Sequence, residues 1–181
     1  MKKIQNPEFG INLNDSPEIL LKQIIGLLED SNYPDNHKTI TALGNLGTSI
    51  VPLLHEILCS ENGHIRLEAV KVVKYIADRR SIPILIYLLD ESETGIRWVA
   101  AEGLVNIGRS SILPLLRSIR DRINPAFLYK GAHHVLNSLL YADEKEKLQT
   151  LLLCLDNYHQ LGGISPVLAS KALETTFKRS A

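Results

Sequence analysis

The sequence has few of the residues on which several classes of protein depend. Cysteine occurs only at Cys59 and Cys154, without a Cys-x-x-Cys pair, so we expect neither a disulfide framework nor a cysteine zinc site. Each cysteine lies within or at the end of an apolar stretch, which predicts two buried thiols. The 181 residues include three Phe, six Tyr and one Trp, and this scarcity of aromatics argues against a surface that stacks nucleic-acid bases.

An excess of charge and long apolar runs are also missing. Lys and Arg together number 20, as do Asp and Glu, so the formal net charge is zero, whereas a duplex-binding protein usually carries a basic surface. No stretch reaches the roughly 18 apolar residues that indicate a membrane-spanning helix. The opening residues MKKIQNPEFG lack the apolar core of a signal peptide. These absences predict a cytoplasmic protein without a nucleic-acid or membrane partner.

A repeat of 31 residues organises the middle of the chain. Pro52, Pro83 and Pro114 are spaced by that period and lie in the similar contexts IVPLLHEIL, SIPILIYLL and ILPLLRSIR. Arg66 and Arg97 are also 31 residues apart, within HIRLEAVKVVKYIA and GIRWVAAEGLVNIG. Two independent markers with one period indicate a repeated structural unit.

Each repeat contains two helical patterns. The first, called helix A, is an apolar run with proline in its first turn, where a missing N–H costs little because that group has no partner within the helix. The second, helix B, has a stripe at i, i+4, i+7, i+8 and i+11, counted from Ile65 and again from Ile96. Breaks such as SENG and DESETG carry turn residues. Each repeat is therefore predicted to be a helical hairpin, and stacked hairpins bury the apolar faces that one hairpin leaves open.

We predict an all-α solenoid of about five stacked antiparallel hairpins, each with helix A before helix B. Helix starts with a cap and a proline are expected at Ser16-Pro17 and Ser165-Pro166. Residues 1–14 show no periodicity and are expected to form an irregular leader before a single domain, 15–181, in which 143–181 is a divergent C-terminal capping pair. The predicted hairpins are 16–31 with 35–46, 49–60 with 63–78, 81–91 with 94–107, 110–121 with 125–141, and 143–160 with 165–179.

The proline in helix A, the acidic turn and the pattern Ile-Arg-x-x-Ala-x-x-x-Leu resemble the HEAT repeats, an armadillo-like family. The short 31-residue form is similar to the HEAT-like repeats of phycobilin lyases, most clearly over residues 49–108. This resemblance implies a scaffold that binds other proteins, since the enzymes built on this frame are few. It also implies that Arg66 and Arg97 bridge to acidic or carbonyl groups of a neighbouring turn, such as those of Asp90 or Glu91.

The partner site is expected at solvent-facing positions of helix B, because the B helices of such a solenoid usually line its concave surface. Trp98, the only tryptophan, lies off the apolar stripe, and Trp is enriched among interface anchors. We expect it to enter a pocket of the partner, inside a rim of mixed charge that gives a modest salt dependence. The alternative is that Trp98 packs against an adjacent repeat. The predicted partner-binding residues are Lys71, Lys74, Trp98, Glu102, Lys130, His134 and Asn137.

Patterns typical of catalysis and metal binding are missing. The sequence has no Gly-rich phosphate loop, no Gly-x-Ser-x-Gly motif and no paired catalytic carboxylates. His133 and His134 are adjacent, so their side chains point about 100° apart on a helix and cannot easily share one metal ion. We therefore predict a protein that is not an enzyme and has no cofactor or metal.

The main prediction is a non-catalytic scaffold or adaptor for another protein, itself a monomer or weak homodimer. The alternative, implied by the resemblance, is a subunit of a phycobilin lyase-like chromophore lyase or isomerase. Tyr129, His133 and His134 would then act as general acids and bases. A third alternative is a structural module that dimerises through an exposed end of the solenoid.

Overall fold

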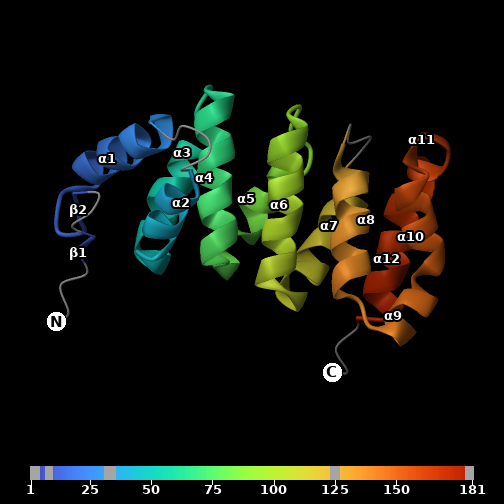
Figure 1. The fold of residues 1–181 in the computed structure, drawn as a ribbon. Helices are drawn as coiled ribbons and strands as arrows, with labels where there is room; N and C mark the ends of the chain where they lie inside the picture. Colours follow the sequence, from blue (N-terminus) through green and yellow to red (C-terminus); the bar gives the residue numbers. More distant parts are fainter. Residues whose placement is uncertain (1–4, 7–9, 31–35, 123–126, 178–181) are drawn as a thin grey trace. The chain divides into compact units, whose positions relative to one another are not determined.

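The computed structural model describes residues 5–6, 10–30, 36–122 and 127–177 (Figure 1). The chain forms two compact units, residues 1–81 and residues 82–181. The described part of the chain is mostly α-helical, which confirms the all-α class and the helical-repeat architecture predicted from the sequence. The predicted helix ends at 31, 35, 125 and 179 lie outside the described residues.

The first unit contains two helical hairpins. In the first, α1 (Pro17–Glu29) precedes α2 (Asn36–Gly44), and in the second, α3 (Val51–Ile57) precedes α4 (Gly63–Ile76). The 3₁₀ turns η1 (Gly47–Ile50) and η2 (Arg79–Ser81) lie in the connections that follow α2 and α4. α4 packs against α1, α2 and α3. The apolar core between them includes Leu20, Ile24, Leu28, Leu43, Leu54, Ile65, Val72 and Val73.

Polar caps fix the starts of two of these helices. The Ser16 hydroxyl accepts a hydrogen bond from the Ile19 amide at 3.4 Å, and Pro17 occupies the first turn of α1, as the sequence predicts. At α4, Asn62 Oδ1 accepts from the amides of His64 and Ile65 at 3.0 and 3.3 Å. These bonds satisfy amide groups that have no partner within their own helix.

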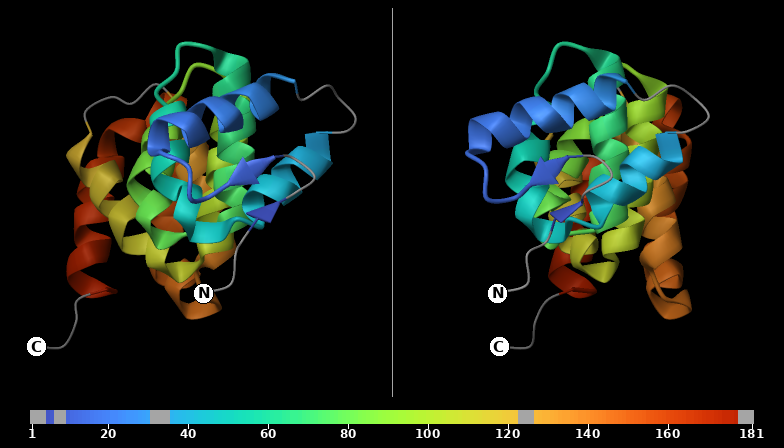
Figure 2. Two further views of the ribbon diagram at one scale, coloured as in Figure 1. Left: turned by 90° about the vertical axis from the view of Figure 1, so that its left-hand side faces the viewer. Right: turned by 60° about the vertical axis from the view of Figure 1, so that its left-hand side comes forward.

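The leader differs from the irregular segment expected for residues 1–14. Strands β1 (Gln5–Asn6) and β2 (Ile11–Asn12) pair antiparallel, with Asn6 opposite Ile11. β2 packs against α1, and Figure 2 shows the strand pair beside that helix. The side chain of Ile11 is buried. A strand of two residues with one buried apolar side chain produces no periodic pattern that the sequence could reveal.

α2 and α4 approach each other closely at Gly44. A β-carbon at position 44 would overlap Cδ1 of Tyr75, so the aromatic ring occupies the space that any larger residue would need. The Tyr75 hydroxyl donates a long hydrogen bond to Asn45 Oδ1 at 3.4 Å. The glycine therefore lets an α4 side chain pack directly on the backbone of α2.

The second unit consists of two layers of helices. One layer contains α5 (Ile82–Leu88), α7 (Ile112–Asp121) and α12 (Ser165–Thr175), and the other contains α6 (Thr94–Ile107), α8 (Leu128–Leu139) and α10 (Gln149–Asp156). Neighbours within each layer pack against each other in that order, and α6, α8 and α10 lie side by side in Figure 1. The short elements η3 (Arg109–Ser111), α9 (Ala142–Lys147), α11 (Tyr158–Leu161) and η4 (Gly162–Ile164) connect these helices.

The last helical pair departs from the predicted order of helix A followed by helix B. α10 packs against α8 and extends the helix-B layer, whereas α12 packs against α7 and extends the helix-A layer. Ser165, at the start of α12, is fully buried, as are Ser81 and Ser111 just before α5 and α7. Pro166 also lies in the first turn of α12. The proline in the first turn that marks helix A is therefore present in this pair, but it lies on the second helix, α12.

The two cysteines differ in exposure. Cys154 on α10 is buried, as predicted, but Cys59 is exposed, which corrects the expectation of two buried thiols. Cys59 follows α3, where the chain turns toward α4, and its Sγ lies 3.6 Å from the carbonyl oxygen of His55. The apolar stretch that ends at Cys59 continues one residue beyond the buried face of the helix.

Candidate functional site

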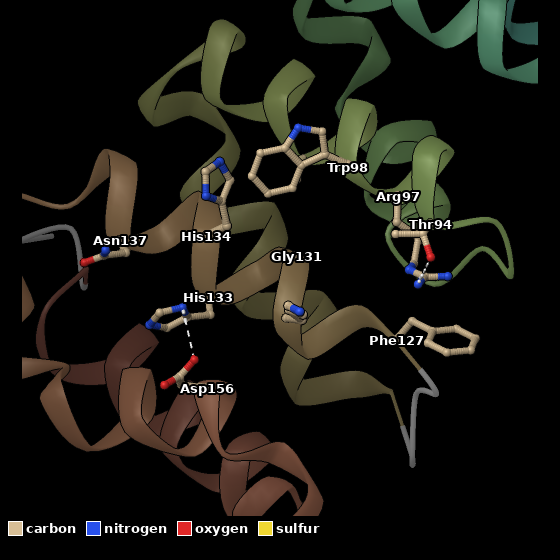
Figure 3. Close-up of a pocket in the computed structure, with 11 residues that line it drawn as sticks. Thr94, Arg97, Trp98, Phe127, Gly131, His133, His134, Asn137 and Asp156 are labelled. Atoms are coloured by element: carbon tan, nitrogen blue, oxygen red, sulfur yellow. Dashed lines mark hydrogen bonds and ion pairs between the residues drawn. The ribbon is translucent and has the colours of Figure 1, made fainter.

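A pocket of about 400 Å³ lies in the second unit, on the layer formed by α6, α8 and α10 (Figure 3). We call it the α6–α8 pocket because most of its lining comes from these two helices. Four of the seven predicted partner-binding residues line it, namely Trp98, Lys130, His134 and Asn137. The other lining residues are Thr94, Arg97, Ala101, Phe127, Gly131, His133 and Asp156.

Trp98 forms one wall of this pocket. The apolar stripe of α6 is buried at Ile96, Ala100 and Leu104, and Trp98 lies off that stripe. As a result 56% of its surface is exposed. Its ring centroid lies 4.8 Å from that of His134 on α8, with the two rings tilted by 41°. Trp98 therefore both contacts the neighbouring repeat and presents an open face to the pocket, so the two sequence-based alternatives for this residue are not exclusive.

Glu102 holds His134 in position against Trp98. Its Oε1 lies 2.7 Å from Nε2 of His134, and it stands one turn after Trp98 on the same face of α6. An ionised carboxylate can only accept hydrogen bonds, so Nε2 carries the proton in this contact. Glu102 does not line the pocket itself. It acts through His134, whose ring it orients.

His133 faces a different helix from His134. Its Nδ1 lies 3.9 Å from Oδ1 of Asp156, the last residue of α10, whereas His134 faces α6. Figure 3 shows the two side chains pointing in different directions. This agrees with the angle expected for adjacent residues on a helix. Among the described residues, no group of three His, Cys, Asp or Glu side chains is placed to hold a metal ion.

Arg97 stabilises the turn between α5 and α6. Its Nη1 donates to the carbonyl oxygens of Glu91 and Ser92, both at 2.7 Å, and its Nη2 donates to Thr94 Oγ1 at 2.8 Å. The guanidinium carbon also lies 4.2 Å from the ring centroid of Phe127. The bridging role implied for Arg97 is confirmed, with backbone carbonyls as the acceptors.

Arg66 makes the equivalent contacts in the first unit. Its Nη1 donates to the carbonyl oxygens of Ser60 and Glu61 at 2.8 and 3.0 Å. Asp90, the other predicted acceptor for Arg97, instead caps α8. Its Oδ1 accepts from the amides of Phe127 and Leu128 at 2.6 and 3.2 Å.

Lys71 and Lys74 do not line the α6–α8 pocket, because they belong to α4 of the first unit. Lys71 Nζ lies 2.6 Å from Oε1 of Glu68, a carboxylate whose side chain is only 2% exposed. Lys71 therefore has a structural role in neutralising a buried acid.

Tyr129 does not line the pocket with the two histidines with which the lyase alternative groups it. It is 6% exposed, whereas His133 and His134 both line the pocket. Burial raises the pKa of the Tyr129 hydroxyl above its ordinary value, which keeps it protonated.

The sequence did not indicate every residue of the pocket. Asp156 was missed because α10 was expected in the helix-A layer, and it belongs to the helix-B layer. Phe127 lies within the helix predicted for 125–141, but it was missed because it occupies the N-cap position of α8, before the helix-B positions that the repeat aligns. Arg97 was recognised as a turn-bridging residue, but its position at the pocket was not. The alignment of the repeats could have indicated Arg97, because this residue directly precedes Trp98 in the sequence.

Comparison with known proteins identifies the repeat. The family model described as HEAT repeats matches residues 21–105, a span that runs from within α1 almost to the end of α6. This part of the chain consists of HEAT repeats. α8 and α10 lie beyond the matched residues but continue the layer that α6 begins. No curated protein matches the chain.

HEAT repeats are commonly scaffolds for protein interactions. None of the helices that the structure describes is long and apolar enough to span a membrane.

Proposed function

We propose that this chain is a non-catalytic scaffold in the cytoplasm that binds a partner protein, with the α6–α8 pocket as the contact site. The observation that carries the proposal is the position of Trp98. The single tryptophan of the chain is 56% exposed and forms a wall of a pocket of about 400 Å³. Tryptophan is enriched among the residues that dominate interface energies.

The mode of binding differs from the one expected from the sequence. Because Trp98 forms a wall of a pocket in this chain, we propose that it receives a side chain of the partner there and does not itself enter a pocket of the partner. The partner therefore supplies the inserted side chain. The contacts among Trp98, His134 and Glu102 fix the wall before binding, so little side-chain entropy is lost when the partner arrives. Lys130 and Asn137 supply polar contacts at the pocket, and Lys71 and Lys74 are proposed as a separate contact region on α4.

The test is a pull-down that compares Trp98→Ala with Tyr87→Ala. Tyr87 is the matched control, because it is also an exposed aromatic of the second unit, at 63%, and it does not line the pocket. Tagged wild-type chain and both variants are used as baits in a lysate of the source cells, with mass spectrometry as the readout. An interface anchor contributes about 2 kcal/mol or more, so Trp98→Ala should weaken binding roughly thirtyfold.

We expect at least one protein to be retained by the wild type and by Tyr87→Ala and lost by Trp98→Ala. Thermal melting followed by circular dichroism checks that all three baits are folded. If a folded Trp98→Ala bait retains the same proteins as the wild type, the pocket is not the contact site. Gel filtration over a concentration series tests the expected monomer or weak homodimer.

A further inference from the structure

Around the α6–α8 pocket, acidic side chains have close partners of opposite or potential positive charge, whereas two cationic side chains have none among the described residues. Two of the acids near the pocket face a histidine, since Asp156 Oδ1 lies 3.9 Å from His133 and Glu102 Oε1 lies 2.7 Å from His134. Within the described part of the chain, the cations Arg97 and Lys130 have no carboxylate partner. The pocket therefore has positive charge that its own residues do not neutralise.

This positive charge lies at one end of the pocket. Arg97 is in the first turn of α6 and Lys130 is in the first turn of α8. Figure 3 shows Arg97, Thr94 and Phe127 at that end and the His133–Asp156 contact at the other. The bonds to the turn carbonyls fix the guanidinium of Arg97, whereas Lys130 is exposed and its flexible stem can reach a ligand.

Three further acids, Asp90, Glu91 and Glu93, lie in the turn before α6, and none of them lines the pocket. Asp90 accepts the two amides at the start of α8, and its Oδ2 lies 3.6 Å from Nη1 of Arg122. Arg122 offsets its charge, so Asp90 does not cancel the positive charge of Lys130 and Arg97.

The pocket also has apolar surface. Trp98 is 56% exposed and Phe127 is 39% exposed, and both line the pocket. The volume of about 400 Å³ is at the small end of the range of roughly 300–1,000 Å³ that is typical of ligand sites. The pocket therefore has room for side chains of a peptide segment, with an apolar contact and a cationic contact close together.

We propose that the α6–α8 pocket binds a segment of the partner in which an Asp or Glu side chain stands next to an apolar side chain. The carboxylate pairs with Lys130, within the field of Arg97, and the apolar side chain packs between Trp98 and Phe127. This inference rests on the proposed function, because it specifies the chemistry of the segment that the scaffold recognises. An acidic segment is favoured over a basic one by charge complementarity.

The test is a selection of random linear peptides displayed on phage, with the wild-type chain as target. Selected peptides are then synthesised with a fluorescent label, and their binding is measured by anisotropy. The variants are Trp98→Ala, Lys130→Glu and Lys171→Glu. Lys171 is the matched control for the charge reversal, because it is an exposed lysine of α12 in the same unit and lies outside the pocket.

We expect the enriched peptides to share an Asp or Glu beside Phe, Leu, Ile, Met or Tyr. Their affinity should fall about tenfold or more with Lys130→Glu, because an attractive charge contact becomes a repulsive one, and should be unchanged with Lys171→Glu. A peptide in which the acidic residue is replaced by Lys should bind Lys130→Glu more tightly than it binds the wild type.

The outcomes separate this inference from the proposed function. If the enriched peptides lack an acidic residue but lose binding with Trp98→Ala, the pocket is a protein-binding site and the acidic-segment inference is wrong. If the enriched peptides bind Trp98→Ala and Lys130→Glu as tightly as the wild type, both proposals are wrong. A selection that enriches no peptide also counts against both.

Discussion

Arg109 and Glu144 form a bidentate ion pair that spans 35 residues of the sequence. Nη1 of Arg109 lies 2.9 Å from Oε2 of Glu144, and Nη2 lies 2.6 Å from Oε1. Arg109 also donates to the carbonyl oxygen of Leu139 at 2.8 Å, and its guanidinium lies 3.9 Å from the ring centroid of Tyr141. These contacts tie η3 to the end of α8 and the start of α9, so the ion pair joins consecutive repeats within the second unit.

Replacing Glu144 with Gln is expected to lower the free energy of unfolding by about 1–2 kcal/mol, because Arg109 loses a charge-assisted bidentate partner. Urea denaturation at neutral pH measures this change. The hydrogen bonds from Arg109 hold the pKa of the Glu144 carboxyl below its ordinary value of 4.5. The stabilisation is therefore complete above pH 4.5 and is lost as the pH falls through the lower pKa of the folded state.

Glu144→Gln should remove this contribution to the pH dependence of the unfolding free energy, whereas Glu146→Gln should retain it. Glu146 is the matched control because it is an exposed carboxylate of the same short helix. An acid-unfolding profile of Glu144→Gln that coincides with that of the wild type would contradict the assignment.

His55 is expected to give the stability a second pH dependence, nearer to neutrality. Its Nε2 lies 2.9 Å from the Ser81 hydroxyl. Burial first, and then the positive charge of Arg80, lower the pKa of the imidazole below its ordinary value of 6.5, against an opposing effect of Asp78. The unfolded chain therefore binds a proton at His55 at a higher pH than the folded chain does. Stability is fully present above pH 6.5 and decreases as the pH falls below that value.

His55→Gln should flatten the dependence of the unfolding free energy on pH just below 6.5. His64→Gln is the control, because His64 is an exposed histidine of the same unit. Urea titrations at closely spaced pH values make the comparison. The prediction for His55 is wrong if the His64 variant, and not the His55 variant, loses the slope.

The sequence was sufficient for the repeat and for part of the site, for a physical reason. A stripe of apolar residues and a proline in the first turn are local signals, so the boundaries of α6 at Thr94 and Ile107 matched the prediction. Four of the predicted residues line one pocket because a repeat period carries a position of one helix B to the same face of the next, namely Trp98, Lys130, His134 and Asn137.

The rest of the site depends on packing between helices that are not related by the repeat. Asp156 reaches the pocket only because α10 packs against α8, and the divergent sequence of α10 carries no repeat marker. The ion pair of Arg109 with Glu144 likewise depends on the path of the chain through α9. Contacts of this kind are set by the three-dimensional course of the chain, which periodicity does not record.

Gly44→Ala is expected to destabilise the first unit by about 1–3 kcal/mol, because the added methyl group would overlap the ring of Tyr75. Urea denaturation measures the loss. The matched control is Gly26→Ala on α1, where nothing lies within 4 Å of the added β-carbon. That change should be neutral or should stabilise the helix by up to about 1 kcal/mol.

A double-mutant cycle with Tyr75→Ala identifies the cause of the effect at Gly44. If the clash with the ring is responsible, Gly44→Ala should cost much less in the Tyr75→Ala background than in the wild type. Equal costs in the two backgrounds would show that the aromatic ring is not the obstacle.

The fluorescence of Trp98 should report directly on the contact with His134, because Trp98 is the only tryptophan in the chain. His134→Ala removes the ring that lies 4.8 Å from the indole, so the emission maximum should move to longer wavelengths as more water reaches Trp98. Loss of an aromatic contact costs about 0.5–1.5 kcal/mol, so binding of the selected peptides should weaken by roughly three- to tenfold. Glu102→Ala should shift the emission maximum and weaken peptide binding in the same directions but by less, because it removes the 2.7 Å hydrogen bond that orients His134 and leaves the ring in place.

His133→Ala is the control, since His133 faces Asp156. An emission shift in the His133 variant that equals the shift in the His134 variant would contradict the proposed arrangement of the pocket wall.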